Sequence, residues 1–267
     1  MAALKYPTIK LPELIYYALS FSAFLMTLSL LLRPEWKRAL ATGALVGLTY
    51  LTKASALPGL ILFIAFGGVW FLMRAWRDRH GSVGNRGALP GLAATGLVAL
   101  AFLVVVFPYI RTSRNIYGSY FYNVNSTFYM WYDTEDQIFT GTRMHGDREG
   151  WPRMPPEEIP GPAKYFREHS ASQIAGRITS GFRRLHDTAR KSYGFYKYLL
   201  LYGGCVAVLI AMRPRAWLEH ARRRRGQILF SLLYVLGYLT AFAWSSASIL
   251  ATNRLSLQLF LPMIFCL

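Results

Sequence analysis

The stretch ALATGALVGLTYLTKASALPGLILFIAFGGVWFLM, residues 39–73, decides how the chain folds. Its only charged residue is Lys53, and Pro58 follows five positions later. One helix of this length would measure about 50 Å, whereas the hydrocarbon core of a bilayer is about 30 Å thick. We therefore expect two helices, 39–52 and 54–73, which form a hairpin with Lys53 at its tip.

Further apolar runs flank this hairpin on both sides. Apolar residues make up 54% of the 267-residue chain, and its mean hydropathy is +0.26. A run of about 20 apolar residues is long enough to cross a bilayer. The remaining spans are expected at 11–32, 88–109, 195–212, 227–244 and 255–267. These runs predict an all-α polytopic membrane protein with about seven transmembrane helices and one large outer loop.

The basic residues give the expected orientation of the spans. The chain has a net charge of +17, and the short loops 33–38, 74–87 and 213–226 carry 3, 4 and 6 of its Lys and Arg residues. All three loops lie on one side if 39–73 is a hairpin, and the positive-inside rule makes that side cytoplasmic. Because these charges cluster between apolar runs, a nucleic-acid partner is not expected. We predict an integral protein of the plasma (inner) membrane that contacts membrane lipid.

The domain organisation follows from these spans. Residues 1–110 are expected to hold transmembrane helices 1–4, and 195–267 helices 5–7. Between them, 111–194 forms an extracytoplasmic loop whose basic part, 163–191, has the 3.6-residue periodicity of an interfacial helix. The last apolar run is only about 13 residues long. We therefore expect a truncated final helix and a chain that lacks both ends of a longer protein.

Four basic residues fall on the predicted outer side. Lys53 lies at the hairpin tip, Arg111 and Arg114 follow a span, and Arg254 opens the last one. Outer-side cations run against the topological bias, and an anionic lipid headgroup or a phosphate ligand would explain them. The alternative is snorkelling of Lys53 and interfacial anchoring by the arginines. The functional hypothesis is that all four converge on one phosphate-binding site.

Other groups in the loop have a functional and a plainer interpretation. The carboxylates Asp133, Glu135 and Asp136 suit acid–base catalysis, but solvated loops often contain such clusters. The sequence His145-Gly-Asp147 has no second ligand pair, so no metal site is predicted. The aromatic residues of 111–132 either stack on sugars or form an interfacial belt, and we favour the belt. No cofactor is expected.

Three motifs resemble the GT-C membrane glycosyltransferases, a superfamily that includes the protein mannosyltransferases and the lipid A aminoarabinose transferases. Residues 43–53, GALVGLTYLTK, are similar to the helix motif G-x-x-x-G-L-x-x-L-T-K of that superfamily. Residues 108–123 resemble its segment P-W-x-x-R-N-…-G-x-P-F-x-N, with Tyr109 and Tyr120 in place of Trp and Pro. Residues 253–262 resemble its late R-Y-L-L-P-x-x-P helix, with Leu255 in place of Tyr.

The resemblance implies an enzyme that transfers a sugar from a polyprenyl-phosphate donor to a lipid or protein acceptor on the outer side. It also implies a catalytic carboxylate in an outer loop upstream of Lys53. The only acidic residue that precedes Lys53 on that side is Glu13, which lacks the acidic neighbour typical of the family. We therefore expect this chain to be the middle and C-terminal part of such an enzyme, inactive alone, with no catalytic residue assigned.

Two other classes share the topology. A transporter or lipid flippase usually carries polar residues at mid-membrane, whereas these spans are almost free of charge. A non-catalytic membrane protein of envelope assembly would need no convergent cations. The outer-side cations therefore favour the glycosyltransferase.

Overall fold

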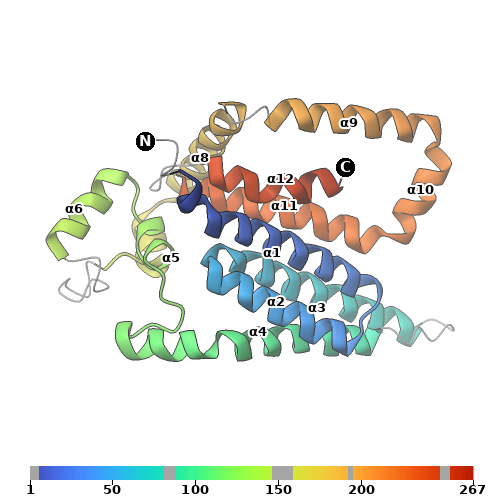
Figure 1. The fold of residues 1–267 in the computed structure, drawn as a ribbon, viewed down its shortest axis with the longest axis horizontal. Helices are drawn as coiled ribbons and strands as arrows, with labels where there is room; N and C mark the ends of the chain where they lie inside the picture. The colour runs from blue at the N-terminus through green and yellow to red at the C-terminus, as the bar shows by residue number, and fades with distance from the viewer. Residues whose placement is uncertain (1–5, 81–87, 146–158, 192–194, 247–252, 267) are drawn as a thin grey trace. The chain divides into compact units, whose positions relative to one another are not determined.

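A computed structural model describes residues 6–80, 88–145, 159–191, 195–246 and 253–266 (Figure 1). Side chains are described for the slightly shorter ranges 13–77, 89–140, 159–191, 197–246 and 258–265. Within the described backbone all regular structure is helical and no β-strand occurs. The all-α class that the apolar runs predict is thus confirmed.

The apolar runs and the long loop both fold as helices, with the following bounds. The larger helices are α1 (Tyr6–Leu32), α2 (Trp36–Thr52), α3 (Leu57–His80), α4 (Ala88–Tyr117), α8 (Ala171–Lys191), α9 (Phe195–Met212), α11 (Arg225–Ser245) and α12 (Asn253–Cys266). The shorter ones are α5 (Val124–Thr127), α6 (Glu135–His145), α7 (Pro162–Glu168), α10 (Pro214–Arg223) and the 3₁₀ turns η1 (Ala54–Ala56) and η2 (Tyr129–Trp131).

Four of the described helices are long and apolar enough to cross a membrane. They cover Glu13–Leu32, Ala54–Arg77, Leu89–Tyr117 and Arg225–Ser245. A fifth span is possible if α9 and α10, which are bent by 107° at their junction, count as one. Helix α2 has 17 residues and α12 has 14, so both are shorter than the 18 residues of a full-length candidate. These helices indicate an integral membrane protein, and seven spans stay a prediction.

The chain divides into two compact units. Unit 1 contains Met1–Val106, Phe195–Tyr238 and Leu257–Leu267, and unit 2 contains Phe107–Gly194 and Leu239–Ser256. Most of the long apolar helices thus belong to unit 1, and the predicted outer loop belongs to unit 2 together with the last turns of α11.

In unit 1, α2 packs closely on its neighbours through small residues. Helix α1 lies along α2. On α2, a Cβ added at Gly43 would collide with the carbonyl oxygen of Val98 on α4, and one at Gly47 would lie 2.8 Å from the Cβ of Val105. Small residues four positions apart let two membrane helices approach closely. The glycines of the G-x-x-x-G motif therefore pack α2 against α4.

Helix α2 ends at Lys53, the residue predicted for the hairpin tip. Lys53 has an extended backbone (φ −158°, ψ 123°), and its N–H donates to the carbonyl of Thr49 at 3.0 Å. The turn η1 follows and leads directly into α3. The chain therefore breaks the long apolar stretch at its only charged residue, and Pro58 lies in the first turn of α3, where a missing N–H is tolerated.

Two segments that the sequence predicted to be loops are helical. Helix α4 continues through Pro108 to Tyr117, eight residues beyond the expected end of that span. It stops before Gly118, whose φ of +72° suits glycine and whose N–H donates to the carbonyl of Arg114 at 3.0 Å. The predicted loop 213–226 contains α10, which begins with a proline at its first position. Both segments were predicted as loops because they are polar, and the prediction was wrong because a helix can continue beyond its apolar part.

Candidate functional site

Lys53 lies beside a carboxylate in unit 1. Its Nζ is 3.8 Å from Oε1 of Glu13 on α1 and 5.4 Å from the centroid of the Tyr16 ring. The side chain of Lys53 is 33% exposed and that of Glu13 is 17% exposed. Lys53 and Glu13, called the Lys53 pair below, therefore form a partly shielded ion pair at the break after α2. Sequence reasoning named both residues but had no means of placing them in contact.

Hydrogen bonds connect Tyr16, whose ring lies next to Lys53, with other helices of unit 1. Ser55 donates a hydrogen bond from its Oγ to the Tyr16 hydroxyl at 2.9 Å. The Tyr238 hydroxyl donates to the Ser55 carbonyl at 3.0 Å and accepts from the N–H of Gly59 at 3.2 Å. These bonds tie α1, η1, α3 and α11 together around a tyrosine-lined interior.

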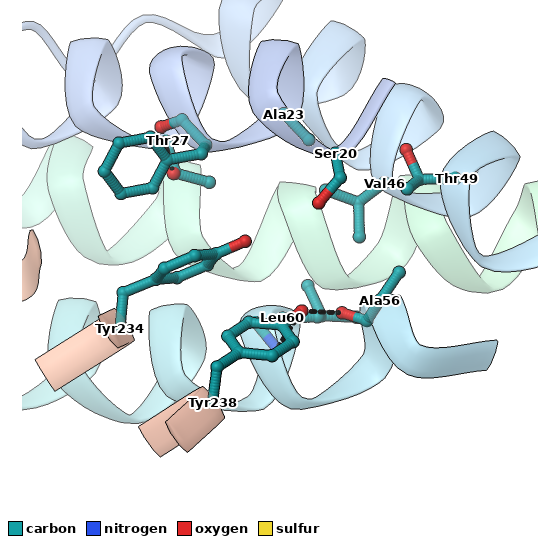
Figure 2. A pocket seen from close by; sticks show the side chains of 11 residues that line it. Ser20, Ala23, Thr27, Val46, Thr49, Ala56, Leu60, Tyr234 and Tyr238 are labelled. Carbon is teal, nitrogen blue, oxygen red and sulfur yellow. Dashed lines mark hydrogen bonds between the residues drawn. The ribbon is translucent and has the colours of Figure 1, made fainter. Parts of the chain in front are cut away.

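Beyond these tyrosines lies a small cavity (Figure 2). Its volume is about 20 Å³, which is room for about one water molecule. Tyr234 and Tyr238 border it on one side, and Ser20, Thr27 and Thr49 contribute further hydroxyl groups. A cavity of this size and polarity suits one bound water, and it is too small for a sugar or a phosphate.

Arg111 and Arg114 belong to the last turns of α4, in unit 2. Both are exposed. Arg114 donates a hydrogen bond to the Gly118 carbonyl, and its guanidinium carbon lies 5.1 Å from the Tyr120 ring centroid. Between them, Ser113 is buried, donates to the Ser119 carbonyl at 2.6 Å and accepts from the Tyr122 N–H at 2.9 Å. Arg114 and Ser113 thus hold the chain that leaves α4.

The predicted convergence of four cations remains a prediction. Lys53 is described within unit 1, and Arg111 and Arg114 within unit 2. The backbone of Arg254 is in α12, but its side chain lies outside the described residues, as do the side chain of His145 and all of Asp147. What the structure adds is the contact between Lys53 and Glu13.

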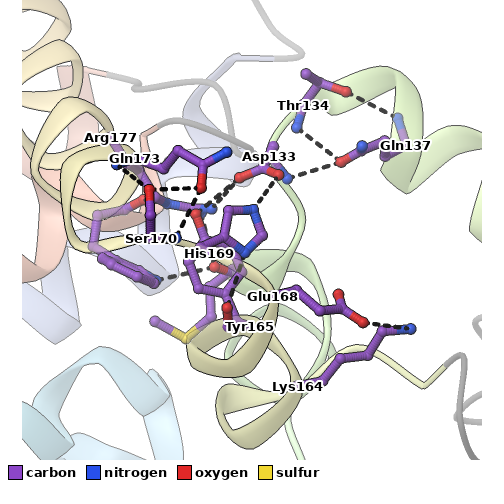
Figure 3. A network of polar contacts seen from close by, with 12 residues as sticks. Asp133, Thr134, Gln137, Lys164, Tyr165, Glu168, His169, Ser170, Gln173 and Arg177 are labelled. Atoms are coloured by element: carbon purple, nitrogen blue, oxygen red, sulfur yellow. Dashed lines mark hydrogen bonds and ion pairs between the residues drawn. The ribbon is translucent and has the colours of Figure 1, made fainter.

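A second polar cluster, in unit 2, surrounds Asp133 (Figure 3). Oδ1 of Asp133 accepts from the Tyr165 hydroxyl at 2.8 Å and from a terminal nitrogen of Arg177 at 3.1 Å. Oδ2 lies 2.9 Å from Nε2 of His169. Tyr165 is on α7, His169 directly follows α7 and Arg177 is on α8, so one carboxylate binds the segment after η2 to both helices. The Asp133 cluster below means Asp133, Tyr165, His169, Arg177 and Trp244.

Arg177 is the centre of this cluster. Its side chain is only 4% exposed. Nε donates to the carbonyl of Trp244 at 3.2 Å, and a terminal nitrogen donates to the carbonyl of Met130 at 2.8 Å. The guanidinium carbon lies 4.5 Å from the Trp244 ring and 4.8 Å from the Tyr165 ring. A buried arginine is stabilised by such combined hydrogen bonds, ion pairing and cation–π contacts.

The hydrogen bonds of His169 favour its charged form. Its Nδ1 lies 2.9 Å from the carbonyl oxygen of Tyr165 and its Nε2 lies 2.9 Å from the Asp133 carboxylate. Both partners are acceptors, so both nitrogens donate only in the imidazolium form. Burial lowers the pKa of His169, but the hydrogen bond and charge of Asp133 and the Tyr165 carbonyl outweigh it and raise the pKa above its usual value.

The same contacts make Asp133 a poor catalytic base. Burial raises the pKa of Asp133, but hydrogen bonds from His169 and Tyr165 and the charges of His169 and Arg177 lower it below its usual value overall. A carboxylate that accepts three hydrogen bonds and has a lowered pKa takes up a proton weakly. The Asp133 cluster therefore fits a structural role better than the acid–base role that we considered from the sequence.

The sequence contains one signal for this cluster. Arg177, Gly181, Leu185 and Ala189 are the buried residues of α8 and recur every four positions. A Cβ added at Gly181 would collide with the backbone of Ala243, near the end of α11. An arginine in register with small and apolar residues on a basic helix is thus a candidate for burial. Periodicity alone does not supply its partners.

Comparison of the chain with known protein families, with curated proteins and with solved structures found no match. Among the described residues, no group of three or more His, Cys, Asp or Glu side chains is arranged to hold a metal ion. Any function of the Lys53 pair and of the arginines at the end of α4 therefore rests on their own geometry.

Proposed function

We propose that the chain is part of a glycosyltransferase of the GT-C type, which takes a sugar from a polyprenyl-phosphate donor on the outer side of the membrane. The acceptor would be a lipid or a protein. The observation that carries this proposal is the Lys53 pair at the end of the 43–53 motif. It presents a lysine at a helix break, beside a carboxylate and over a tyrosine ring.

The proposed chemistry assigns Lys53 to the donor phosphate. When the bond from the sugar to the phosphate breaks, negative charge grows on the phosphate, and a nearby cation stabilises that charge. Glu13 balances the charge of Lys53 while no donor is bound. At 3.8 Å this ion pair is at the long end of the range for direct contact, so a phosphate competes with it readily.

The proposed topology has seven spans. Helix α2 would add to the four full-length candidates, because 17 residues extend about 25 Å and lie at the lower limit for crossing. Helices α9 and α12 would complete the set, and the basic residues of 33–38, 74–87 and 213–226 would then share the cytoplasmic side. Arg111 and Arg114 at the end of α4 would face the same side as Lys53.

The test is binding of undecaprenyl phosphate to the purified protein in detergent. Loss of a charge-assisted contact costs about 1.5–3 kcal/mol, so Lys53→Ala should weaken binding by at least about tenfold. Lys53→Arg should retain most of the affinity. Lys197→Ala, at an exposed lysine on α9, is the matched control and should bind like the unchanged protein.

Glu13→Gln separates this proposal from simple packing of the pair. If Glu13 competes with the phosphate, its neutral form should bind the carrier more tightly. Unchanged affinity in both Lys53→Ala and Glu13→Gln would reject the phosphate site. Carrier binding with movement of the lipid across vesicles, and no sugar transferred, would favour the transporter class instead.

A further inference from the structure

A second candidate binding surface lies at the opposite end of α2 from Lys53. A groove of about 380 Å³ is formed where the connection between α1 and α2 and the first residues of α2 meet the first turns of α4. Pro90, Ala93, Ala94 and Leu97 form its wall on α4. This volume falls within the range of about 300–1,000 Å³ that is typical of small-molecule sites. The groove, called the α4 groove below, lies entirely within unit 1.

The other wall of the α4 groove carries a tryptophan and a lysine. Trp36 is 60% exposed, and Lys37 is exposed, with its Nζ 5.5 Å from the Trp36 ring centroid. Pro34 joins them on this wall. Tryptophan with a basic neighbour is typical of the boundary between the hydrocarbon and headgroup regions of a bilayer.

The basic side chains at the groove outnumber the acidic ones, which favours the binding of an anion. Glu35 also lines it, but Oε2 of Glu35 is 3.1 Å from Nε of Arg38, which further donates to Ser29 at 3.1 Å. The negative charge of Glu35 is thus offset by Arg38. Arg33, on the connection, and Lys37, in the first turn of α2, remain as exposed cations. Residues 33–38 together have three basic residues and one acidic residue.

The groove lies at the level where two candidate membrane spans end. One candidate span ends at Leu32 and another begins at Leu89, so both walls lie at the ends of spans. The wall on α4 is made of small and apolar side chains of the span itself, and the cations lie just outside it. Such an arrangement suits a molecule with an apolar tail and an anionic head.

We propose that the α4 groove binds an anionic phospholipid of the cytoplasmic leaflet, with its phosphate at Lys37 and one acyl chain along Pro90, Ala93 and Leu97. The basic loops assign the groove to the cytoplasmic side by the positive-inside rule. Anionic lipids are attracted to that side by basic residues close to the membrane. This site is separate from the proposed donor site and does not depend on it.

Tryptophan quenching measures the proposed binding directly. The purified protein in detergent is titrated with phosphatidylglycerol that carries brominated acyl chains, and with brominated phosphatidylcholine for comparison. The chain has seven tryptophans, so the signal of Trp36 is taken as the difference from Trp36→Phe. The proposal expects saturable quenching of Trp36 at lower concentrations of phosphatidylglycerol than of phosphatidylcholine.

Variants separate the head from the tail of the lipid. One cation near a membrane surface contributes about 1 kcal/mol, so Lys37→Gln should weaken phosphatidylglycerol binding about fivefold, while Lys37→Arg keeps it. Ala93→Phe fills the groove without adding a tryptophan and should weaken both lipids. Arg215→Gln, at an exposed residue of α10 that does not line the groove, is the control and should have no effect.

The outcomes that overturn the proposal are equally specific. Equal affinity for both lipids in the unchanged protein would reject an anion site. Full displacement of phosphatidylglycerol by inorganic phosphate would identify a headgroup site without an acyl groove. Unchanged binding in Ala93→Phe would exclude the groove. Lys37→Arg is the safeguard against misfolding, because it should bind normally and give the circular dichroism spectrum of the unchanged protein.

Discussion

The Lys53 pair and the Asp133 cluster contain the same kinds of residue but differ in how closely their charged groups are held. Each combines a carboxylate, a cation and a tyrosine. In the Lys53 pair, the charged atoms are 3.8 Å apart and the lysine is one-third exposed. In the Asp133 cluster, the bonds to the carboxylate are 2.8–3.1 Å long and the arginine is buried between two rings. The first arrangement is looser and more exposed, as the proposed phosphate contact of Lys53 requires, and the second uses its charge to hold the chain together.

Removing Arg177 should have the largest effect on this contrast. Arg177→Ala removes one of the three donors to Asp133 and the Arg177 donor to the Trp244 carbonyl, together with the packing of the guanidinium against two rings. We expect a loss of about 3 kcal/mol in the free energy of unfolding, the upper end of the usual range for one substitution. Arg183→Ala, at an exposed position of the same helix, is the control and should lose less than about 0.5 kcal/mol. Unfolding by SDS, followed by tryptophan fluorescence, measures both. Equal losses would contradict the structural role of the cluster.

The close contact behind Arg177 gives a second, smaller prediction. Gly181→Ala introduces a methyl group against the backbone of Ala243, which cannot move aside, so we expect a loss of about 1–3 kcal/mol. Gly176→Ala on the same helix meets no atom within 4 Å. It should stabilise by about 0.5–1 kcal/mol, because alanine suits a helix better than glycine. Opposite signs in the same SDS titration support the packing; equal signs contradict it.

The smallest expected effect is a dependence on pH. The folded pKa of His169 is raised above 6.5, so its stabilisation is complete below about pH 6.5 and is lost as the pH rises through the folded value. Asp133 has a lowered pKa, so its stabilisation is lost at the other end, as the pH falls below about 3.8. Between these limits the cluster is most stable. The Lys53 pair has no histidine and should lack the alkaline change.

Hydrogen exchange of α7 and α8 between pH 5.5 and pH 9 measures this change. Protection should fall as the pH rises, by less than about tenfold, because the side chain of His169 is partly exposed. His169→Gln keeps a donor toward Asp133 but does not titrate, so its protection should vary less with pH. A pH profile for His169→Gln that matches the unchanged protein would show that another group is responsible.

Local sequence patterns predicted much of unit 1 and little of the Asp133 cluster. The predicted span 195–212 coincides with α9, and the long apolar stretch breaks at Lys53. Both follow from composition within a few turns of chain. Arg177, by contrast, finds its partners 44 to 67 positions away, at Asp133, Met130 and Trp244. Periodicity shows which residues lie on the same face of a helix. Only the tertiary fold determines which other residues pack against that face.

The phosphate site was predicted from residue types and an assumed side of the membrane. That reasoning found Lys53 and Glu13 separately, because both lie on the predicted outer side. Their contact depends on α1 lying along α2, which no motif in either helix specifies. The continuation of α4 from Tyr109 to Tyr117 was missed for a different reason: the apolar run, which already included Pro108, ends there, and the helix continues into polar residues.

Gly43 and Gly47 have a consequence for Lys53 itself. The backbone of α2 contacts α4 directly at these two positions. If α2 shifted by one residue, a side chain would replace each glycine there and would collide with α4. One residue of slip shifts a helix by about 1.5 Å and turns it by about 100°. Such a turn would swing Lys53 away from Glu13. Gly43 and Gly47, about three and two turns before Lys53, thus fix the axial position and the direction in which the lysine side chain leaves α2.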